Sequence, residues 1–143
     1  MELEPIRLTL QVPCTPEAAF EGLTSGMGRW WDPAYTPDPD TFTTVTVAPG
    51  GLVTLVHGPT EFPVGEVVTW EPGVRYRQRF WLAMDPAAPS ELDVRFTADD
   101  GGTRVDFEHG GWTEANAQWR HKFGDWPHLL GRYSALVSEP TPG

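Results

Sequence analysis

The side chain best suited to chemistry in this sequence is His109, which ends a run of alternating polar and apolar residues. The alternation over 103–110 places His109 on the apolar face of a strand. The same period-two pattern places Tyr76 and Gln78 on the inward face of another strand. A neutral imidazole among apolar side chains could orient a ligand carbonyl or act as a general base.

The alternative role for His109 is structural, with its ring bonded to a backbone carbonyl at the start of the following helix. A catalytic role would require a carboxylate or a tyrosine within hydrogen-bond reach of the imidazole. Glu61 and Glu66 could supply a carboxylate, but the sequence does not fix which way their strand faces. Both roles therefore stay open at this stage.

Aromatic side chains are the second notable group, because seven Trp and seven Phe supply unusually large apolar surfaces. They could line a pocket for a flat or apolar ligand, or they could fill the core completely. The candidate ligand-binding residues are Trp30, Trp31, Tyr76, Gln78, Phe80, His109, Trp112, Trp119, Phe123 and Trp126. The proline-rich stretch 33–39, with Tyr35, is either a lid over such a pocket or an ordinary surface loop.

Other kinds of catalysis find little support in the residue types. His121 and His128 are seven residues apart with Asp125 between them, but their helical face points away from the sheet, so no metal site is expected. Cys14 follows Pro13 and has no basic neighbour in sequence to activate its thiol. No nucleophile elbow, phosphate-binding loop or dinucleotide fingerprint occurs, so no cofactor is expected.

Length and composition indicate one folded domain. The chain has 143 residues, of which 39% are hydrophobic and 21% charged. We place the domain at 1–143, with its core at about 5–138 and a short tail at 139–143. The net charge of −10 argues against nucleic acid and against an anionic membrane surface as partners.

Cysteine usage and the N-terminus predict a cytoplasmic location. A single cysteine cannot form an intrachain disulfide, which fits a reducing compartment. Residues 1–12 are too polar and too short for a signal peptide, and no apolar run approaches the length of a membrane span. The sequence leaves the oligomeric state open.

Short periodic segments predict a mainly antiparallel sheet. Residues 6–12 alternate as a strand, and Thr15-Pro16-Glu17 then supplies an N-cap, a first-turn proline and an early acid for a helix that stops near Gly26. Six further strands are expected at about 41–48, 51–57, 64–71, 74–83, 90–98 and 103–110. Only short turns separate them, which favours a meander because parallel strands need long crossovers.

The two faces of this sheet differ in character. One face of the last three strands carries nine charges of mixed sign: Arg75, Arg77, Arg79, Glu91, Asp93, Arg95, Arg104, Asp106 and Glu108. Mixed signs in neighbouring rows favour a water-facing surface with cross-strand ion pairs rather than an anion site. The opposite face is apolar and needs a cover.

The C-terminal segment 113–137 is the expected cover. At about 100° per residue, one helical stripe contains its large apolar side chains. These are Trp112, Ala115, Trp119, Phe123, Trp126, Leu130, Tyr133 and Val137. Pro127 predicts a kink or a break after Gly124, followed by a helix to about Val137.

Several short motifs, taken in order, resemble a known family. They are Thr15-Pro16-Glu17-Ala18-Ala19-Phe20, Trp30-Trp31, Pro49-Gly50-Gly51, Gly65-Glu66-Val67, Trp70-Glu71-Pro72, Gly102-Thr103-Arg104-Val105 and His109-Gly110-Gly111-Trp112. Their order over about 5–138 is similar to the START-like helix-grip (SRPBCC) superfamily, in the branch related to the activator of heat-shock-protein ATPase. One departure is Gly73, which stands where the family commonly has a second proline.

The resemblance implies an α+β helix-grip fold. In it a curved antiparallel meander of about seven strands, with two short helices after the first strand, wraps around a long C-terminal helix. The resemblance also implies a hydrophobic cavity between sheet and helix, but it implies no single reaction.

The leading functional hypothesis is a small cytoplasmic protein that holds a hydrophobic or aromatic molecule in this cavity, with His109, Gln78 and Tyr76 as polar contacts. The hypothesis needs an enclosed cavity of at least roughly 300 Å³. The second hypothesis is a cyclase- or hydrolase-like enzyme with His109 as the general base. A chaperone-associated interaction module is the third, and the family resemblance alone supports it.

Overall fold

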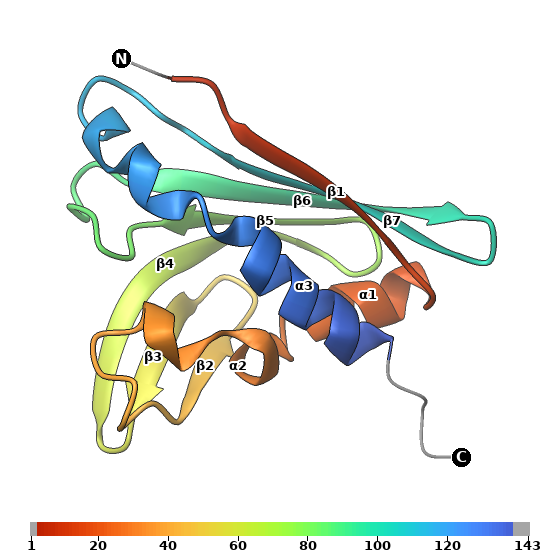
Figure 1. The fold of residues 1–143 in the computed structure, drawn as a ribbon, viewed down its shortest axis with the longest axis horizontal. Helices are drawn as coiled ribbons and strands as arrows, with labels where there is room; N and C mark the ends of the chain where they lie inside the picture. The colour runs from red at the N-terminus through yellow and green to blue at the C-terminus, as the bar shows by residue number, and fades with distance from the viewer. Residues whose placement is uncertain (1–2, 139–143) are drawn as a thin grey trace.

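One curled antiparallel sheet of seven strands dominates the computed structural model, which describes residues 3–138 (Figure 1). The strands are β1 (Ile6–Val12), β2 (Thr44–Val47), β3 (Leu52–His57), β4 (Thr60–Glu71), β5 (Arg75–Phe80), β6 (Ser90–Asp99) and β7 (Gly102–Gly110). Their order is β1-β7-β6-β5-β4-β3-β2, so the predicted meander is confirmed and the first strand pairs with the last. The predicted tail at 139–143 lies outside the described residues.

The helices lie on one side of the sheet (Figure 1). They are α1 (Pro16–Leu23), α2 (Met27–Trp30), the 3-10 helices η1 (Pro33–Tyr35) and η2 (Ala117–Phe123), and α3 (Trp126–Val137). Both α1 and α2 contact α3, so the three helices cover the inner face together. The α+β helix-grip fold is therefore confirmed. No helix within residues 3–138 is long and apolar enough to cross a membrane.

Three strands differ from the sequence-based prediction by three or more residues at one end. Strand β2 starts at Thr44 rather than at residue 41, and the bounds of β4 and β5 differ for local reasons. Strand β4 starts at Thr60 rather than at residue 64 and includes Pro63. Its pairing with β5 starts only at Gly65, so the proline lies where β4 has a single neighbour, beside a register shift in the β3–β4 pairing. Strand β5 ends at Phe80 rather than at residue 83, because Ala83 has a φ of +57° that no strand residue adopts.

The C-terminal segment is less helical than predicted in its first half. Residues 111–113 are irregular and 114–116 form a turn, η2 is a 3-10 helix, and α3 begins only at Trp126, after the predicted break at Gly124. The buried Asn116 side chain holds the turns, because its Nδ2 donates to the carbonyls of Ala88 (3.2 Å) and Pro89 (3.1 Å) on the β5–β6 connection. The predicted stripe is consequently wrong at Ala115, which is exposed.

The Pro72-Gly73 turn explains the departure from the family pattern. The N–H of Val74 donates to the carbonyl of Glu71 at 2.9 Å, which closes a tight turn between β4 and β5. Gly73 has a φ of +75°, whereas a proline ring holds φ near −65°. A proline at this position could not make the turn that this chain makes.

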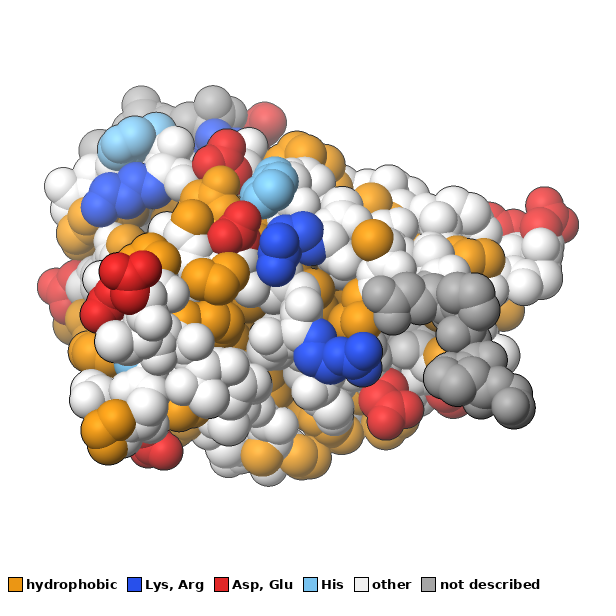
Figure 2. Space-filling model, turned by 60° about the horizontal axis from the view of Figure 1, so that its bottom comes forward, with side chains coloured by type: hydrophobic (Ala, Val, Ile, Leu, Met, Phe, Trp, Pro, Cys, Tyr) orange, Lys and Arg blue, Asp and Glu red, His pale blue; other side chains and the backbone are white. Residues whose placement is uncertain are grey.

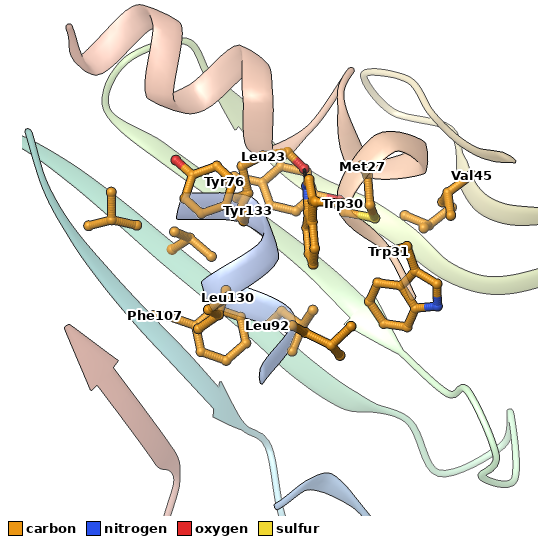
Figure 3. Close-up of a cluster of buried hydrophobic side chains, with 14 of the residues drawn as sticks. Leu23, Met27, Trp30, Trp31, Val45, Tyr76, Leu92, Phe107, Leu130 and Tyr133 are labelled. Carbon is orange, nitrogen blue, oxygen red and sulfur yellow. Dashed lines mark hydrogen bonds between the residues drawn. The ribbon is translucent and has the colours of Figure 1, made fainter. Parts of the chain in front are cut away.

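The outer face of the sheet carries the predicted ion pairs. Register places Arg77 opposite Asp93, but the pairs form diagonally, with Arg75 bound to Asp93 at 2.6 Å and Arg77 bound to Glu91. The inner face packs against the helices, and Figure 3 shows side chains from the sheet, α2 and α3 pointing toward one another there. The charged face and the aromatic face therefore lie on opposite sides of the same strands.

Candidate functional site

His109 is completely buried at the end of β7, and both of its ring nitrogens are hydrogen-bonded. The indole Nε1 of Trp126 donates to Nδ1 at 2.9 Å, so Nε2 carries the proton and donates to Ser90 Oγ at 2.7 Å. Ser90 Oγ in turn donates to the carbonyl of Phe80 at 3.0 Å. Burial disfavours the imidazolium and lowers the pKa of His109 to about 3.

Both ring nitrogens therefore have partners inside the protein, and these are Ser90 and Trp126 rather than the backbone carbonyl expected for a structural histidine. The carboxylates considered for an acid–base pair are elsewhere, since Glu61 is exposed and Glu66 pairs with Arg79 on the outer face at 3.2 Å. Among the described residues, the printed bonds of the His109 ring involve no carboxylate.

The side chains of Tyr76 and Gln78 are also hydrogen-bonded to each other inside the protein. Tyr76 Oη donates to Gln78 Oε1 at 2.6 Å, and Gln78 Nε2 donates to the carbonyl of Arg79 at 3.1 Å. Both residues are 1% exposed, and burial raises the pKa of the Tyr76 hydroxyl. The three polar groups of the inner face therefore point into packed protein.

The space between the sheet and α3 is filled by side chains. Trp30 donates from Nε1 to the carbonyl of Gly22 at 3.1 Å, and its ring packs edge-on against Tyr133 with 5.9 Å between centroids (Figure 3). A cavity of about 20 Å³ remains beside Trp30, Gln78 and Leu92. That is room for about one water molecule and not for a ligand. The predicted enclosed cavity between the sheet and the C-terminal helix is therefore wrong, because aromatic side chains fill this space.

A larger pocket, of about 350 Å³, opens at one end of this packed region. Its wall comes from the segment 34–37, from residues 82–83 after β5, and from the junction of η2 and α3. The lining residues are Trp31, Ala34, Tyr35, Thr36, Pro37, Phe80, Leu82, Ala83, Lys122, Phe123, Asp125, Trp126 and Leu129. Figure 2 shows hydrophobic side chains gathered on one face of the molecule among acidic, basic and histidine side chains.

The structure divides the sequence-predicted site residues into three groups. Trp31, Phe80, Phe123 and Trp126 line the 350 Å³ pocket. A second group is buried away from its wall and consists of Trp30, Tyr76, Gln78, His109 and Trp112. Trp119 is half-buried in η2 and does not line the pocket.

The pocket wall also contains residues that were not predicted from the sequence: Leu82, Ala83, Lys122 and Leu129. Leu82 and Ala83 fall in a region read as strand, and the 3-10 geometry of η2 could not be foreseen from an α-helical stripe. Leu129 is adjacent to the predicted Leu130, so a wider apolar stripe would have included it.

Two hydrogen bonds fasten the rim loop (residues 32–37) to the start of α3. Tyr35 Oη donates to Asp125 Oδ2 at 2.7 Å, and His128 Nε2 bonds to Asp32 Oδ2 at 2.8 Å. The bond from His128 lowers the pKa of Asp32, and the bond to Asp125 raises the pKa of the Tyr35 hydroxyl. The proline-rich stretch is thus part of the pocket wall, held to the opposite wall by side chains.

Residues 13–137 match the family described as Activator of Hsp90 ATPase homolog 1-like protein. The chain belongs to this family. None of the curated proteins matches the sequence of this Hsp90 ATPase activator-like chain.

Within residues 3–138, no three His, Cys, Asp or Glu side chains are grouped so that they could hold a metal ion.

Solved structures with the same fold are distant in sequence. The Aha1 dimer from Colwellia psychrerythraea is 18% identical with a TM-score of 0.66, covering 94% of this chain and 96% of that one. Protein MLL2253 from Mesorhizobium loti is 20% identical with a TM-score of 0.63, at 94% and 96% coverage. CalU16 from Micromonospora echinospora is 16% identical with a TM-score of 0.65, at 96% and 77% coverage. At these identities the likeness concerns the fold alone.

Proposed function

We propose that this chain is a cytoplasmic protein that binds an apolar or aromatic small molecule in the 350 Å³ pocket between the rim loop and the η2–α3 junction. The observation that carries the proposal is the pocket itself, whose wall is mostly apolar and aromatic. Its volume lies in the range of small-molecule sites, at about 300–1,000 Å³. A molecule with one or two aromatic rings is the size that suits it.

The aromatic side chains of the pocket wall are already held in place by contacts within the protein, which supports a binding role for the pocket. Trp126 is held by its bond to His109, and its ring contacts Phe107 with 4.6 Å between centroids. Trp31 donates from Nε1 to the carbonyl of Tyr35 at 3.2 Å, so its indole is fixed to the rim loop. Rigid aromatic walls lose little conformational entropy when a ligand binds.

The test is a titration of the ¹⁵N-labelled chain with 2-(2-naphthyl)ethanol, a neutral aromatic probe. The indole N–H signals of Trp31 and Trp126 are expected to shift, because both rings line the pocket. The signal of Trp70 is the internal reference, since its ring packs on Phe20 and Tyr76 outside the pocket.

Leu82→Trp is expected to fill the pocket and weaken binding of the probe at least about tenfold, because a ligand must displace the added ring. Leu52→Trp makes the same change at an exposed position on β3, outside the pocket wall, and should bind as the wild type does. Shifts at Trp70 alone, or equal binding by both variants, would overturn the proposal.

The other two hypotheses gain no comparable support. An enzyme with His109 as base would need a free ring nitrogen, and both nitrogens are occupied by Ser90 and Trp126. A chaperone-associated module would need an exposed apolar docking surface, whereas the feature that supports our proposal is concave.

A further inference from the structure

Lys122 is the single lysine of the chain, and it lies on the wall of the 350 Å³ pocket. Its Nζ reaches across the opening to the carbonyl of Ala83 at 3.4 Å, which is a long contact with a neutral acceptor. Among residues 3–138 it forms no ion pair, while five arginines of the sheet are paired with carboxylates. The ammonium therefore has protons to offer to a ligand.

The other polar side chains of the pocket wall already have partners. Tyr35 and Asp125 bond to each other at 2.7 Å, and Thr36 Oγ1 donates to the carbonyl of Pro33 at 2.7 Å. The Asp125 carboxylate would repel a second anion placed beside it, but its bond turns it toward the rim loop. An anionic group on a ligand would therefore be placed at Lys122, on the Ala83 side of the opening.

We infer that the ligand of this pocket is an amphipathic carboxylate, with an aromatic or apolar body against Trp31, Phe80 and Leu129 and its carboxylate on Lys122 Nζ. The inference rests on the binding function proposed above and names its ligand class. The chain itself carries a net charge of −10, so a local cation is what an acid would need in order to bind here.

The experiment compares two probes of nearly the same shape, 2-naphthylacetic acid and the neutral 2-(2-naphthyl)ethanol. Lys122→Met keeps the length of the side chain and removes its charge. It should weaken the acid about three- to fivefold, the upper range for one charged contact at a solvent edge, and leave the alcohol within about 1.5-fold. Lys122→Arg should restore acid binding to within about 1.5-fold, because the charge returns.

Arg95→Met is the matched control, because it removes one positive charge from the exposed outer face of β6 and changes the net charge by the same amount. It should leave binding of both probes unchanged. The single lysine also allows a direct readout: reductive ¹³C-methylation labels only Lys122 and the N-terminal amine. The Lys122 methyl signal should shift with the acid and not with the alcohol.

The outcomes separate the two proposals. If the alcohol binds in the pocket but Lys122→Met leaves acid binding unchanged, the carboxylate inference is overturned and the binding function stands. Equal losses for Lys122→Met and Arg95→Met would show a long-range charge effect and would also overturn the inference. If neither probe binds, both proposals fail for aromatic ligands of this size.

Discussion

The packed space between the sheet and α3, around Trp30, Tyr76, His109 and Tyr133, is called the sealed region here. It and the open pocket beside it are built from the same kinds of side chain, yet only the pocket has room for a ligand. In the sealed region, polar atoms pair internally, as in the bond of Tyr76 to Gln78 and the bonds of His109 to Ser90 and Trp126. In the pocket, the aromatic walls end at a rim whose polar groups lie near water.

Aromatic content therefore does not by itself mark a binding site. Large rings close a region when neighbouring elements supply partners for each polar edge, as β6 and α3 do around His109. They leave a hollow where one wall is an irregular segment, here the rim loop and the turn at Ala83. Matched substitutions in the two regions test this difference.

The largest expected effect comes from two leucine truncations. Leu130 on α3 is completely buried in the sealed region, whereas Leu82 is half-buried on the pocket wall. Leu130→Ala should cost about 2–5 kcal/mol of unfolding free energy, because it leaves a cavity in packed surroundings. Leu82→Ala should cost less than about 1 kcal/mol, because it enlarges a space already open to water.

Urea denaturation of the two variants and the wild type measures both values. If the two losses are equal, the pocket wall is as tightly packed as the core, and the distinction between the regions fails. Leu82→Ala should also retain binding of the naphthyl probes, since it widens the pocket and leaves its aromatic walls in place.

The next effect concerns the pH dependence of stability. The native pKa of His109 is about 3, below its ordinary value of 6.5. As the pH falls from about 6.5 to about 3, the unfolded chain takes up a proton at His109 and the folded chain does not. Stability from this residue is therefore fully present above about pH 6.5 and is lost toward pH 3, by up to about 1.4 kcal/mol per pH unit.

Urea denaturation at pH 7, 6 and 5 should show this slope in the wild type and a shallower one in His109→Gln. His121→Gln is the control, because it removes an exposed histidine and leaves the Ser90–His109–Trp126 bonds intact. An unchanged slope in His109→Gln would mean that the sealed region admits water or a proton to the imidazole.

Much of the fold could be predicted from the sequence because its signals are local. Period-two alternation located the strands, Thr15 and Pro16 marked the start of α1, and the break before Pro127 followed from the proline ring. The irregular segment 111–116 could not be predicted, because it depends on Asn116 reaching carbonyls 27 and 28 residues away.

The candidate site was predicted less well for a related reason. Alternation correctly placed His109, Tyr76 and Gln78 on the inner face, but it says nothing about whether such groups bind each other or a ligand. The pairing of His109 with Trp126 is a contact between β7 and α3 that no sequence spacing encodes. The pocket depends likewise on Ala83, whose backbone turns away from the sheet.

The smallest expected effect comes from removing one tyrosine hydroxyl in each region. Tyr133 Oη donates to the carbonyl of Ala19 at 2.7 Å in the sealed region, and Tyr35 Oη donates to Asp125 at the rim. Tyr133→Phe should cost about 1 kcal/mol of unfolding free energy, since it leaves a buried carbonyl with one partner fewer. Tyr35→Phe should change stability by less than about 0.5 kcal/mol, because water replaces an exposed contact.

Tyr35→Phe should instead act on ligand exchange. Loss of its bond leaves the rim loop tied to α3 by Asp32 and His128, so the loop opens more readily. Stopped-flow release of the naphthyl probe should quicken about two- to threefold, as expected for one exposed hydrogen bond of about 0.5 kcal/mol. Tyr133→Phe should release the probe at the wild-type rate, because its hydroxyl lies outside the pocket wall. If both variants release it equally fast, the rim loop does not control access, and the two regions open as one unit.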